Sequence, residues 1–471
     1  MRILRLPMPS PTALIFVLGL ALGGAANAAE SATPPAVVAP GKADATWKVG
    51  EEVTWTVRGT TSATSASYVV RRDGRVAIDQ CAIALGADPA IVRTRSDHAG
   101  TLELDVTVKG PTGKASDVFG GAAIDPAMIT PAVPRPDDFK VFWQAQLAAL
   151  AAIPANPVLV SKPCDQSGVD YWHLTLDSID HRHVQGQLAR PTGTDKRPAL
   201  LLLQYAGVYA LQPHWVTNYA HQGWLVLNVE AHDLPVDEGA AFYADQAAKA
   251  LNNYPAIGCH DRTTSYFLPM VLGAVRAAQY LAGRPDWDGQ ILEVSGTSQG
   301  GFLTLATAGL DPQVTAACAM VPAGCDTNGP AHDRAAAWPY WSNFAKGPEL
   351  TGVFATARYF DACNFAADIT CPTLIGVGLI DPTARPTSVI AAFNQVKGPK
   401  ELVILPGSNH YGTGNTQAPF LKRLAAWTNE QLAGRPAPVQ APRWPQGRAG
   451  RNRTMRVIFD GSHPHLRRAS A

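Results

Sequence analysis

The stretch "LEVSGTSQGGFLTLATAGL", residues 292–310, passes from a short apolar segment to a helical one through a serine set among glycines. A strand that reverses directly into a helix needs residues without a Cβ where the two backbones nearly touch. Gly296 and Gly300 stand at those places. The G-x-S-x-G pattern therefore predicts a tight elbow that holds the hydroxyl of Ser298 at the end of a sheet. A Gly-rich turn without chemistry is the alternative.

The chain around this elbow alternates between apolar strands and helical segments. Continuous apolar strands that alternate with helices indicate a parallel sheet covered on both faces. Two further β segments, 171–179 and 184–191, precede this part, and a helix begins near 136–138. The expected strands are 199–205, 223–229, 290–296, 314–321, 372–379 and 401–407, and the expected helices are 215–222, 263–282, 300–308, 387–395 and 418–431.

Partners for the serine follow the last two apolar strands. A serine hydroxyl is a poor nucleophile until an imidazole takes its proton, and with this kind of elbow the acid and the histidine come later in the chain, in that order. Asp381 follows 372–379, and His410 follows 401–407. Taken singly, Asp381 could merely cap a turn before Pro382, and His410 could be a surface histidine. Together, in this order, they predict a Ser-His-Asp triad.

These motifs carry a resemblance that extends from about residue 131 to 427. The stretches "RPDDFKVFW", "QYAGVY", "GTSQGG" and the long segment 359–412 resemble the acetyl xylan esterase and cephalosporin C deacetylase family, carbohydrate esterase family seven. The resemblance implies an α/β-hydrolase with a mostly parallel sheet. It also implies a deacetylase that uses Ser298 as nucleophile, Asp381 as acid and His410 as base, with no metal and no other cofactor.

The oxyanion hole should consist of two backbone N–H groups. One belongs to Gln299, the residue after the nucleophile. The resemblance places the other at Val208, where the family has Tyr, while an ordinary strand-end turn at Gly207 is the alternative. The chain departs from the family in two further places. Ala231-His232-Asp233 replaces an Arg-Gly-Gln motif, and Tyr411 replaces the Glu after the histidine.

Substrate contacts are sought among aromatic residues near these motifs. Tyr205 lies in "QYAGVY", and Trp338 and Trp341 lie in "AAAWPYWSNF", 335–344. Aromatic faces suit sugar rings, so these three residues are predicted to line the pocket, although core packing is the usual role of large aromatics. His232 and Asp233 either line the pocket mouth or cap a loop.

The regions outside the catalytic segment have their own signatures. Arg2 and Arg5, an apolar run and "ANA" at 26–28 predict a secretory signal peptide over 1–28, and hence export to the periplasm or the extracellular space. The apolar run is too short for a comfortable membrane span, with a retained anchor as the alternative. Residues 31–45 read as a linker.

Short segments in which apolar and polar residues nearly alternate then predict a small immunoglobulin-like β sandwich over 46–110, ahead of the hydrolase domain at 131–432. Residues 435–471 are predicted to be a disordered basic tail, which either stays in solvent without a partner or docks on an anionic surface.

Charge and cysteine content limit the partners. The net charge is +1, but the tail has eight Arg and one Asp, so the body is acidic, which argues against nucleic acid. The seven Cys form no C-x-x-C pair, and their odd number leaves at least one unpaired. His181 and His183 form an H-x-H without an adjacent carboxylate, which favours a surface β segment over a metal site. The expected partner is an acetylated carbohydrate or another small ester, and a homo-oligomer is compatible with the sequence.

Three functions are therefore in competition. The first is a secreted serine esterase that removes acetyl groups from acetylated xylo-oligosaccharides or related small acetate esters. The second is a serine peptidase of the prolyl oligopeptidase type, although only about a hundred residues precede the hydrolase segment, where such enzymes carry a large propeller. The third is an inactive carbohydrate-binding scaffold, which the intact Ser, Asp and His argue against.

Overall fold

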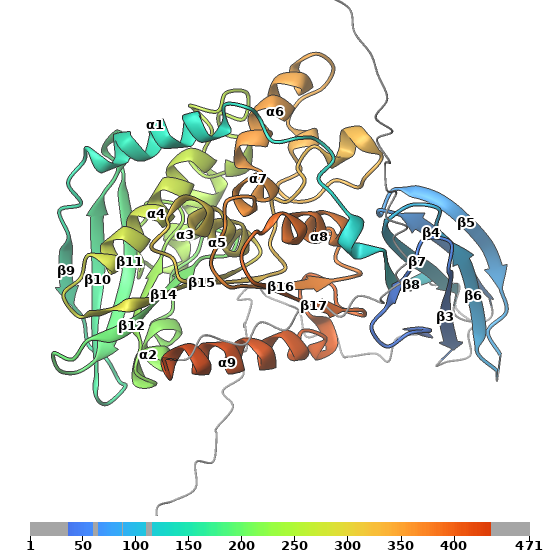
Figure 1. Ribbon diagram of the computed structural model, residues 1–471, viewed down its shortest axis with the longest axis horizontal. Helices are drawn as coiled ribbons and strands as arrows, with labels where there is room; N and C mark the ends of the chain where they lie inside the picture. Colours follow the sequence, from blue (N-terminus) through green and yellow to red (C-terminus); the bar gives the residue numbers. More distant parts are fainter. Residues whose placement is uncertain (1–35, 60–64, 87, 110–114, 435–471) are drawn as a thin grey trace, which may run out of the picture.

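The computed structural model describes residues 36–59, 65–86, 88–109 and 115–434 of the chain. The predicted signal peptide (1–28) and basic tail (435–471) lie outside these ranges. Two bodies make up the described part, a β sandwich at the N-terminal end and a large α/β domain (Figure 1). In the described part, no helix combines the length and the apolarity that a bilayer crossing requires.

The sandwich extends from Ala36 to Ile124, beyond the predicted limits of 46 and 110. One sheet has the order β1-β3-β6 and the other β2-β8-β7-β4-β5. Its strands are β1 (Ala36–Pro40), β2 (Thr46–Trp47), β3 (Glu52–Gly59), β4 (Ser65–Arg72), β5 (Val76–Ile83), β6 (Ala90–Arg95), β7 (Gly100–Lys109) and β8 (Ala115–Ile124).

Two segments outside the predicted limits of 46 and 110 are strands of this sandwich, and the first of them lies within the predicted linker 31–45. Residues 36–40 form β1, which pairs with β3, and 115–124 form β8, which pairs with β7 along its whole length. Strand β8 contains Gly120 and Gly121, which weaken its strand pattern in the sequence. Gly120 is required there, because a Cβ would come within 2.5 Å of Val38 and 2.9 Å of the Trp55 ring. Close packing between the two sheets therefore overrides the low strand propensity of glycine.

The α/β domain is built on a nine-stranded sheet with the order β17-β16-β15-β14-β12-β13-β11-β10-β9. The strands from β12 to β17 are parallel to one another, and β11, β10 and β9 continue the sheet in antiparallel pairs, beginning with the pair β13 and β11. This mostly parallel sheet confirms the predicted fold class. The strands are β9 (Val158–Ser161), β10 (Val169–Asp177), β11 (His183–Pro191), β12 (Arg197–Leu203), β13 (Leu225–Val229), β14 (Trp287–Thr297), β15 (Ala316–Met320), β16 (Thr373–Gly378) and β17 (Lys400–Leu405).

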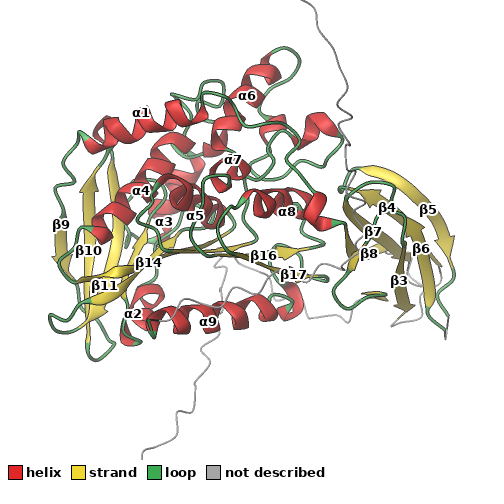
Figure 2. Cartoon of the chain, in the orientation of Figure 1, coloured by secondary structure: helices red, strands yellow, loops and turns green. Residues whose placement is uncertain are grey.

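Helices cover both faces of the sheet, as continuous apolar strands require. Figure 2 shows α2 and α9 on one face, and α4, α5 and α8 on the other. The helices are α1 (Phe139–Ala151), α2 (His214–His221), α3 (Ala240–Ala248), α4 (Phe267–Ala282), α5 (Gln299–Leu310), α6 (Glu349–Ala357), α7 (Ala362–Ala366), α8 (Pro386–Gln395) and α9 (Ala418–Leu432).

Strand order fixes where a site can form. The chain runs from β12 to β13 on one side, then crosses to β14 on the other side of β12. Open α/β sheets bind ligands at such a switch point, outside the carboxyl ends of the strands. The loops after β12, β14, β16 and β17 all leave from this edge, and they carry Val208, Ser298, Asp381 and His410.

Candidate active site

Ser298 occupies a strained elbow between β14 and α5. Its φ of 57° and ψ of −117° are unfavourable for a residue with a Cβ. Neighbouring backbone holds it there: its N–H donates to the Met320 carbonyl at 2.9 Å, and its carbonyl accepts from the Ala323 N–H at 3.0 Å. Such strain is typical of a side chain that must be held in one exact direction.

Both elbow glycines are needed for steric reasons. A Cβ on Gly296 would lie 2.4 Å from the Gly300 backbone, and one on Gly300 would lie 2.2 Å from the Leu203 carbonyl oxygen. The strand, the helix and β12 therefore approach more closely than any other residue type would allow. The G-x-S-x-G pattern has the conformational basis that the sequence suggested.

The structure brings Ser298, His410 and Asp381 into one hydrogen-bonded line. Ser298 Oγ lies 2.9 Å from His410 Nε2, and His410 Nδ1 lies 2.8 Å from Asp381 Oδ2. Asp381 is fully buried, and His410 and Ser298 are almost so, since their exposed fractions are 9% and 7%. A base within reach of a hydroxyl and held by a buried carboxylate is the arrangement that nucleophilic catalysis requires.

Asp381 also caps its own turn. Its Oδ1 accepts the backbone N–H groups of Thr383 and Ala384, each at 2.8 Å, while Oδ2 faces His410. The Asp381 carboxylate therefore caps the turn and contacts the histidine at the same time. The turn orients the carboxylate and leaves one oxygen for the imidazole.

Other acidic residues near this segment serve different partners. Asp361 is buried and accepts the N–H groups of Asp326, Thr327 and Cys363, at the start of α7. Asp368 pairs with Arg135 and Lys140. Neither forms an interaction with His410, so geometry separates Asp381 from both.

The His410 loop is closed by Gln417 and leaves an aromatic side chain exposed. Gln417 donates from Nε2 to the His410 carbonyl at 3.0 Å. Tyr411 is 66% exposed, and its ring stands nearly perpendicular to the imidazole, with the ring centroids 5.6 Å apart. The residue that replaces the family's Glu therefore offers an open aromatic face beside the histidine.

Two backbone N–H groups are available for an oxyanion. Gln299 is the first residue of α5, so its N–H has no partner inside the helix. The N–H of Val208, in the turn after β12, donates no hydrogen bond within the described part of the chain. Gln299 itself is buried, and its side-chain oxygen accepts the Tyr254 hydroxyl at 2.5 Å.

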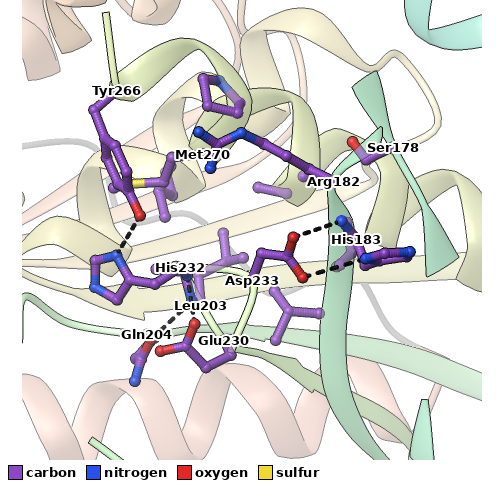
Figure 3. A pocket seen from close by; sticks show the side chains of 17 residues that line it. Ser178, Arg182, His183, Leu203, Gln204, Glu230, His232, Asp233, Tyr266 and Met270 are labelled. Carbon is purple, nitrogen blue, oxygen red and sulfur yellow. Dashed lines mark hydrogen bonds and ion pairs between the residues drawn. The ribbon is translucent and has the colours of Figure 1, made fainter. Parts of the chain in front are cut away.

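His232 fixes the peptide that carries the Val208 N–H. Its Nε2 lies 2.9 Å from the Gly207 carbonyl oxygen and must donate, because a carbonyl only accepts. Its Nδ1 then accepts from the Tyr266 hydroxyl at 3.1 Å (Figure 3). The C=O of Gly207 and the N–H of Val208 belong to one planar peptide and point in opposite directions. The histidine bond therefore sets the direction of that N–H.

This histidine is neutral, and an acidic residue lies behind it. Burial lowers the pKa of His232 to about 4, so both of its nitrogens keep the roles just described. Burial also raises the pKa of Glu230 to about 8. Oε1 of Glu230 has no hydrogen-bond partner among the described residues, and Oε2 accepts the His232 N–H.

Glu230, His232 and Tyr266 help to line the pocket in Figure 3, and none of the Ser-His-Asp residues does. The pocket is lined by Ser178, Arg182, His183, Val184, Leu203, Gln204, Val229, Glu230, Ala231, His232, Asp233, Tyr266, Pro269, Met270, Gly273, Ala274 and Leu303.

The three aromatic pocket predictions have different outcomes. Tyr205 is half-buried beside the Val208 turn and stacks on Tyr209, with the ring centroids 4.7 Å apart. Trp338 is partly buried against Phe267. Trp341 is only 2% exposed and packs in the core, so the structure does not support its expected place in a substrate pocket. The rings of Phe267, Phe344 and Phe360 pack against the indole of Trp341 and remove its apolar surface from water.

The remaining sequence candidates carry no evident chemistry. His183 lies 3.6 Å from Asp233, whose carboxylate also accepts the His183 N–H, so Asp233 caps this loop. His181 is exposed. The described residues contain no cluster of three or more metal-binding side chains. All seven cysteines are described and unpaired.

Sequence reasoning missed Tyr254 and Tyr266, whose contacts with Gln299 and His232 depend on tertiary packing rather than on a motif.

Comparison with known proteins gives a consistent result. Residues 128–429 match the family described as Acetyl xylan esterase (AXE1). Acetyl esterase Axe7A of Xylanibacter ruminicola is 32% identical over 423 residues, covering 86% of this chain and 93% of that protein. An alignment of that extent cannot be confined to residues 128–471, so it includes part of the N-terminal sandwich.

Solved structures show the same fold. An acetyl xylan esterase from Paenibacillus sp. R4 superposes with a TM-score of 0.55 at 23% identity, over 64% of this chain and 98% of that one. Acetyl xylan esterase 1 from Thermoanaerobacterium sp. JW/SL YS485 gives 0.54 at 24% identity, over 64% and 97%.

Proposed function

The chain belongs to the acetyl xylan esterase family and is a carboxylic ester hydrolase that acts on acetyl esters, and we propose that it deacetylates xylan fragments through Ser298, His410 and Asp381. The observation that carries the proposal is the hydrogen-bonded line from Ser298 Oγ through the imidazole to the buried carboxylate. The same line argues against an inactive scaffold. No observation favours a peptidase, because the family acts on acetyl esters.

Acylation begins when His410 Nε2 takes the Ser298 proton and Oγ attacks the acetyl carbonyl carbon. Asp381 accepts the Nδ1–H, holds the imidazole in the required tautomer and stabilises its positive charge. Negative charge develops on the carbonyl oxygen, where the N–H groups of Gln299 and Val208 stabilise it. His410 then protonates the sugar oxygen, and the deacetylated sugar leaves.

Deacylation repeats these roles with water as the nucleophile. His410 takes a proton from the water, the hydroxyl attacks the acetyl-serine carbonyl, and collapse of the tetrahedral intermediate releases acetate and regenerates Ser298. The exposed ring of Tyr411 lies against the His410 imidazole, and the half-buried Tyr205 precedes the Val208 turn, so both offer aromatic faces for the sugar. We also infer that residues 1–28 direct export and are then removed, which N-terminal sequencing of the secreted protein tests.

The direct test measures acetate release from acetylated xylo-oligosaccharides by the wild-type protein and by Ser298→Ala. Ser295→Ala is the matched control, because this serine lies in the same strand outside the triad. We expect Ser298→Ala to lose at least about a thousandfold in kcat and the control to keep full activity. Aryl esters of increasing length should be cleaved less well from acetate to butyrate, since each methylene changes transition-state binding by ~1–3 kcal/mol. Activity that survives in Ser298→Ala, or a profile that peaks at hexanoate, would refute the proposal.

A further inference from the structure

The turn that carries Asp381 lies between the hydrolase sheet and the N-terminal sandwich. Figure 1 shows the sandwich beside the end of the sheet that holds β16 and β17, next to α8. The segment from Leu379 to Asn394 contains Asp381 and the whole of α8 apart from its last residue. Its contacts with the sandwich occur on both sides of the acid in the sequence.

Strand β7 supplies the main contact surface. Its inward residues, such as Leu102 and Leu104, are buried in the sandwich core. Its alternate residues Thr101, Glu103 and Asp105 point the other way, as the period of a strand requires. Thr101 is nevertheless only 3% exposed, because α8 packs over this face. The polar side of β7 is therefore an interface with the hydrolase domain.

Ahead of Asp381, the two bodies touch backbone to backbone. A Cβ on Gly121 of β8 would lie 2.3 Å from the Cβ of Leu379 and 2.7 Å from its carbonyl oxygen. Leu379 is fully buried and precedes Asp381 by two residues. Only glycine lets the sandwich approach the acid turn this closely.

Polar contacts with the sandwich also hold the segment that follows Asp381 in the chain. Arg385 Nη1 lies 3.1 Å from Glu103 Oε2, and both side chains are mostly buried. Thr387, at the start of α8, donates to Asp73 Oδ1 at 2.7 Å and lies 2.5 Å from the Thr101 hydroxyl.

At the far end of α8, Asn394 Nδ2 donates to the carbonyls of Pro126 and Ile129, each at 2.8 Å, in the segment that joins the two bodies. The interface is thus continuous from the acid turn to the interdomain connection.

We propose that the N-terminal sandwich positions the catalytic acid. Gly121 fixes the segment before Asp381, and Glu103 and Asp73 fix the segment after it, so that Asp381 Oδ2 stays within hydrogen-bonding distance of His410 Nδ1. The proposal rests on the proposed function, in which Asp381 is the acid. It assigns the sandwich a place in the catalytic architecture rather than the role of a tethered carbohydrate-binding module. The relative from Xylanibacter ruminicola aligns with part of the same N-terminal region, as a shared positioning role requires.

The test uses the full-length enzyme and a small acetate ester, so that sugar binding does not enter. Arg385→Met and Glu103→Met remove the ion pair singly and together, and the charge swap Glu103→Arg with Arg385→Glu restores it in reverse. Thr387→Val keeps the side-chain shape and removes the hydroxyl. Glu52→Gln is the control, because Glu52 pairs with Arg93 and Arg95 on the exposed side of the sandwich.

We expect the ion-pair and Thr387 variants to lose about tenfold or more in kcat with little change in KM, since small misplacements of catalytic groups are costly. The acidic limb of the kcat/KM profile should move to lower pH, because His410 loses part of the carboxylate that stabilises its charge. The charge swap should recover part of the loss, and Glu52→Gln should behave as wild type.

A lower melting temperature with unchanged kcat and pH profile in folded variants would overturn the proposal and leave the sandwich a stabilising domain only. Unchanged kinetics on the small ester with a raised KM on acetylated xylan would also overturn it, in favour of a substrate-binding domain. These results differ from failure of the proposed function, in which Ser298→Ala and the wild type would hydrolyse acetate esters equally.

Discussion

Replacing His232 by Phe tests how the oxyanion hole is kept in shape. The phenyl ring fills the volume of the imidazole and keeps its edge-to-face contact with Tyr254, whose ring centroid is 4.6 Å from that of His232. It cannot donate to the Gly207 carbonyl. Gly207 has a φ of 132°, a conformation open to glycine alone, so no Cβ restrains this peptide once the bond is lost.

The size of the effect follows from the bond that disappears. A hydrogen bond contributes about 0.5–1.5 kcal/mol net, and a carbonyl left buried without a partner costs about 1–3 kcal/mol. Outright loss of one oxyanion donor lowers kcat by about 10²–10³. Because His232→Phe loosens the Val208 N–H rather than deleting it, we expect kcat to fall by about 10- to 100-fold, with KM nearly unchanged.

The assay compares kcat, KM and the inhibition constant of an arylboronic acid, which forms a tetrahedral adduct with the serine. For His232→Phe, the inhibition constant should rise in parallel with the loss in kcat. His232→Gln restores an amide donor and should lose less. Tyr266→Phe removes the hydroxyl that fixes the tautomer and should lose only a few-fold. If folded His232→Phe kept kcat within twofold of wild type, or changed KM alone, His232 would line the substrate path instead of holding the peptide.

Three further changes test other parts of the molecule. Asp381→Asn should lower kcat by up to ~10⁴ by favouring the wrong imidazole tautomer, whereas Asp368→Asn should retain kcat. A larger loss of kcat in Asp368→Asn than in Asp381→Asn would show that Asp381 is not the acid. Tyr411→Ala should raise KM about 2- to 10-fold for acetylated xylo-oligosaccharides and leave methyl acetate unaffected, since an aromatic contact contributes ~0.5–1.5 kcal/mol; equal effects on both substrates would exclude a sugar contact. Glu293 is fully buried, and burial raises its pKa from 4.5 to about 7. The folded protein therefore keeps this proton to higher pH than the unfolded chain does, and the free energy of unfolding falls as pH rises from about 4.5 to 7. Glu293→Gln should therefore add up to about 3 kcal/mol to the free energy of unfolding at pH 8 and little at pH 4.5, measured by denaturant titration; a gain independent of pH would refute this origin.

The parallel sheet and the Ser-His-Asp arrangement could be predicted because their signals are local. Each strand is an apolar run that ends at a distinctive turn, and the elbow glycines lie within two residues of Ser298. Strand β8 could not be predicted in this way, since Gly120 and Gly121 weaken the strand pattern, and its pairing with β7 and its contact with Leu379 become visible only in three dimensions.

The place of an aromatic residue is equally dependent on its neighbours. Trp338 and Trp341 are separated by two residues, yet one remains partly exposed and the other lies in the core. His232 shows the same limit, because no motif in the sequence marks the Gly207 carbonyl as its hydrogen-bond partner.

Glu230 links the pH dependence of catalysis to this same region. It lies behind the oxyanion turn, and its charge acts on Tyr209, Tyr254 and Tyr266 around it. Since burial raises its pKa to about 8, Glu230 is neutral at pH 7 and becomes an anion above pH 8. A negative charge there opposes the charge that develops on the substrate oxygen in the transition state.

We therefore expect kcat of the wild-type enzyme to decline above about pH 8, and Glu230→Gln to remove that decline while retaining activity at pH 7. His232 cannot cause the decline, because burial lowers its pKa to about 4 and it is already neutral throughout this range. The measurement is kcat between pH 6 and 10 for both proteins, with Asp233→Asn as the control for a neighbouring carboxylate. An alkaline limb that persists unchanged in Glu230→Gln would show that its charge does not reach the oxyanion hole.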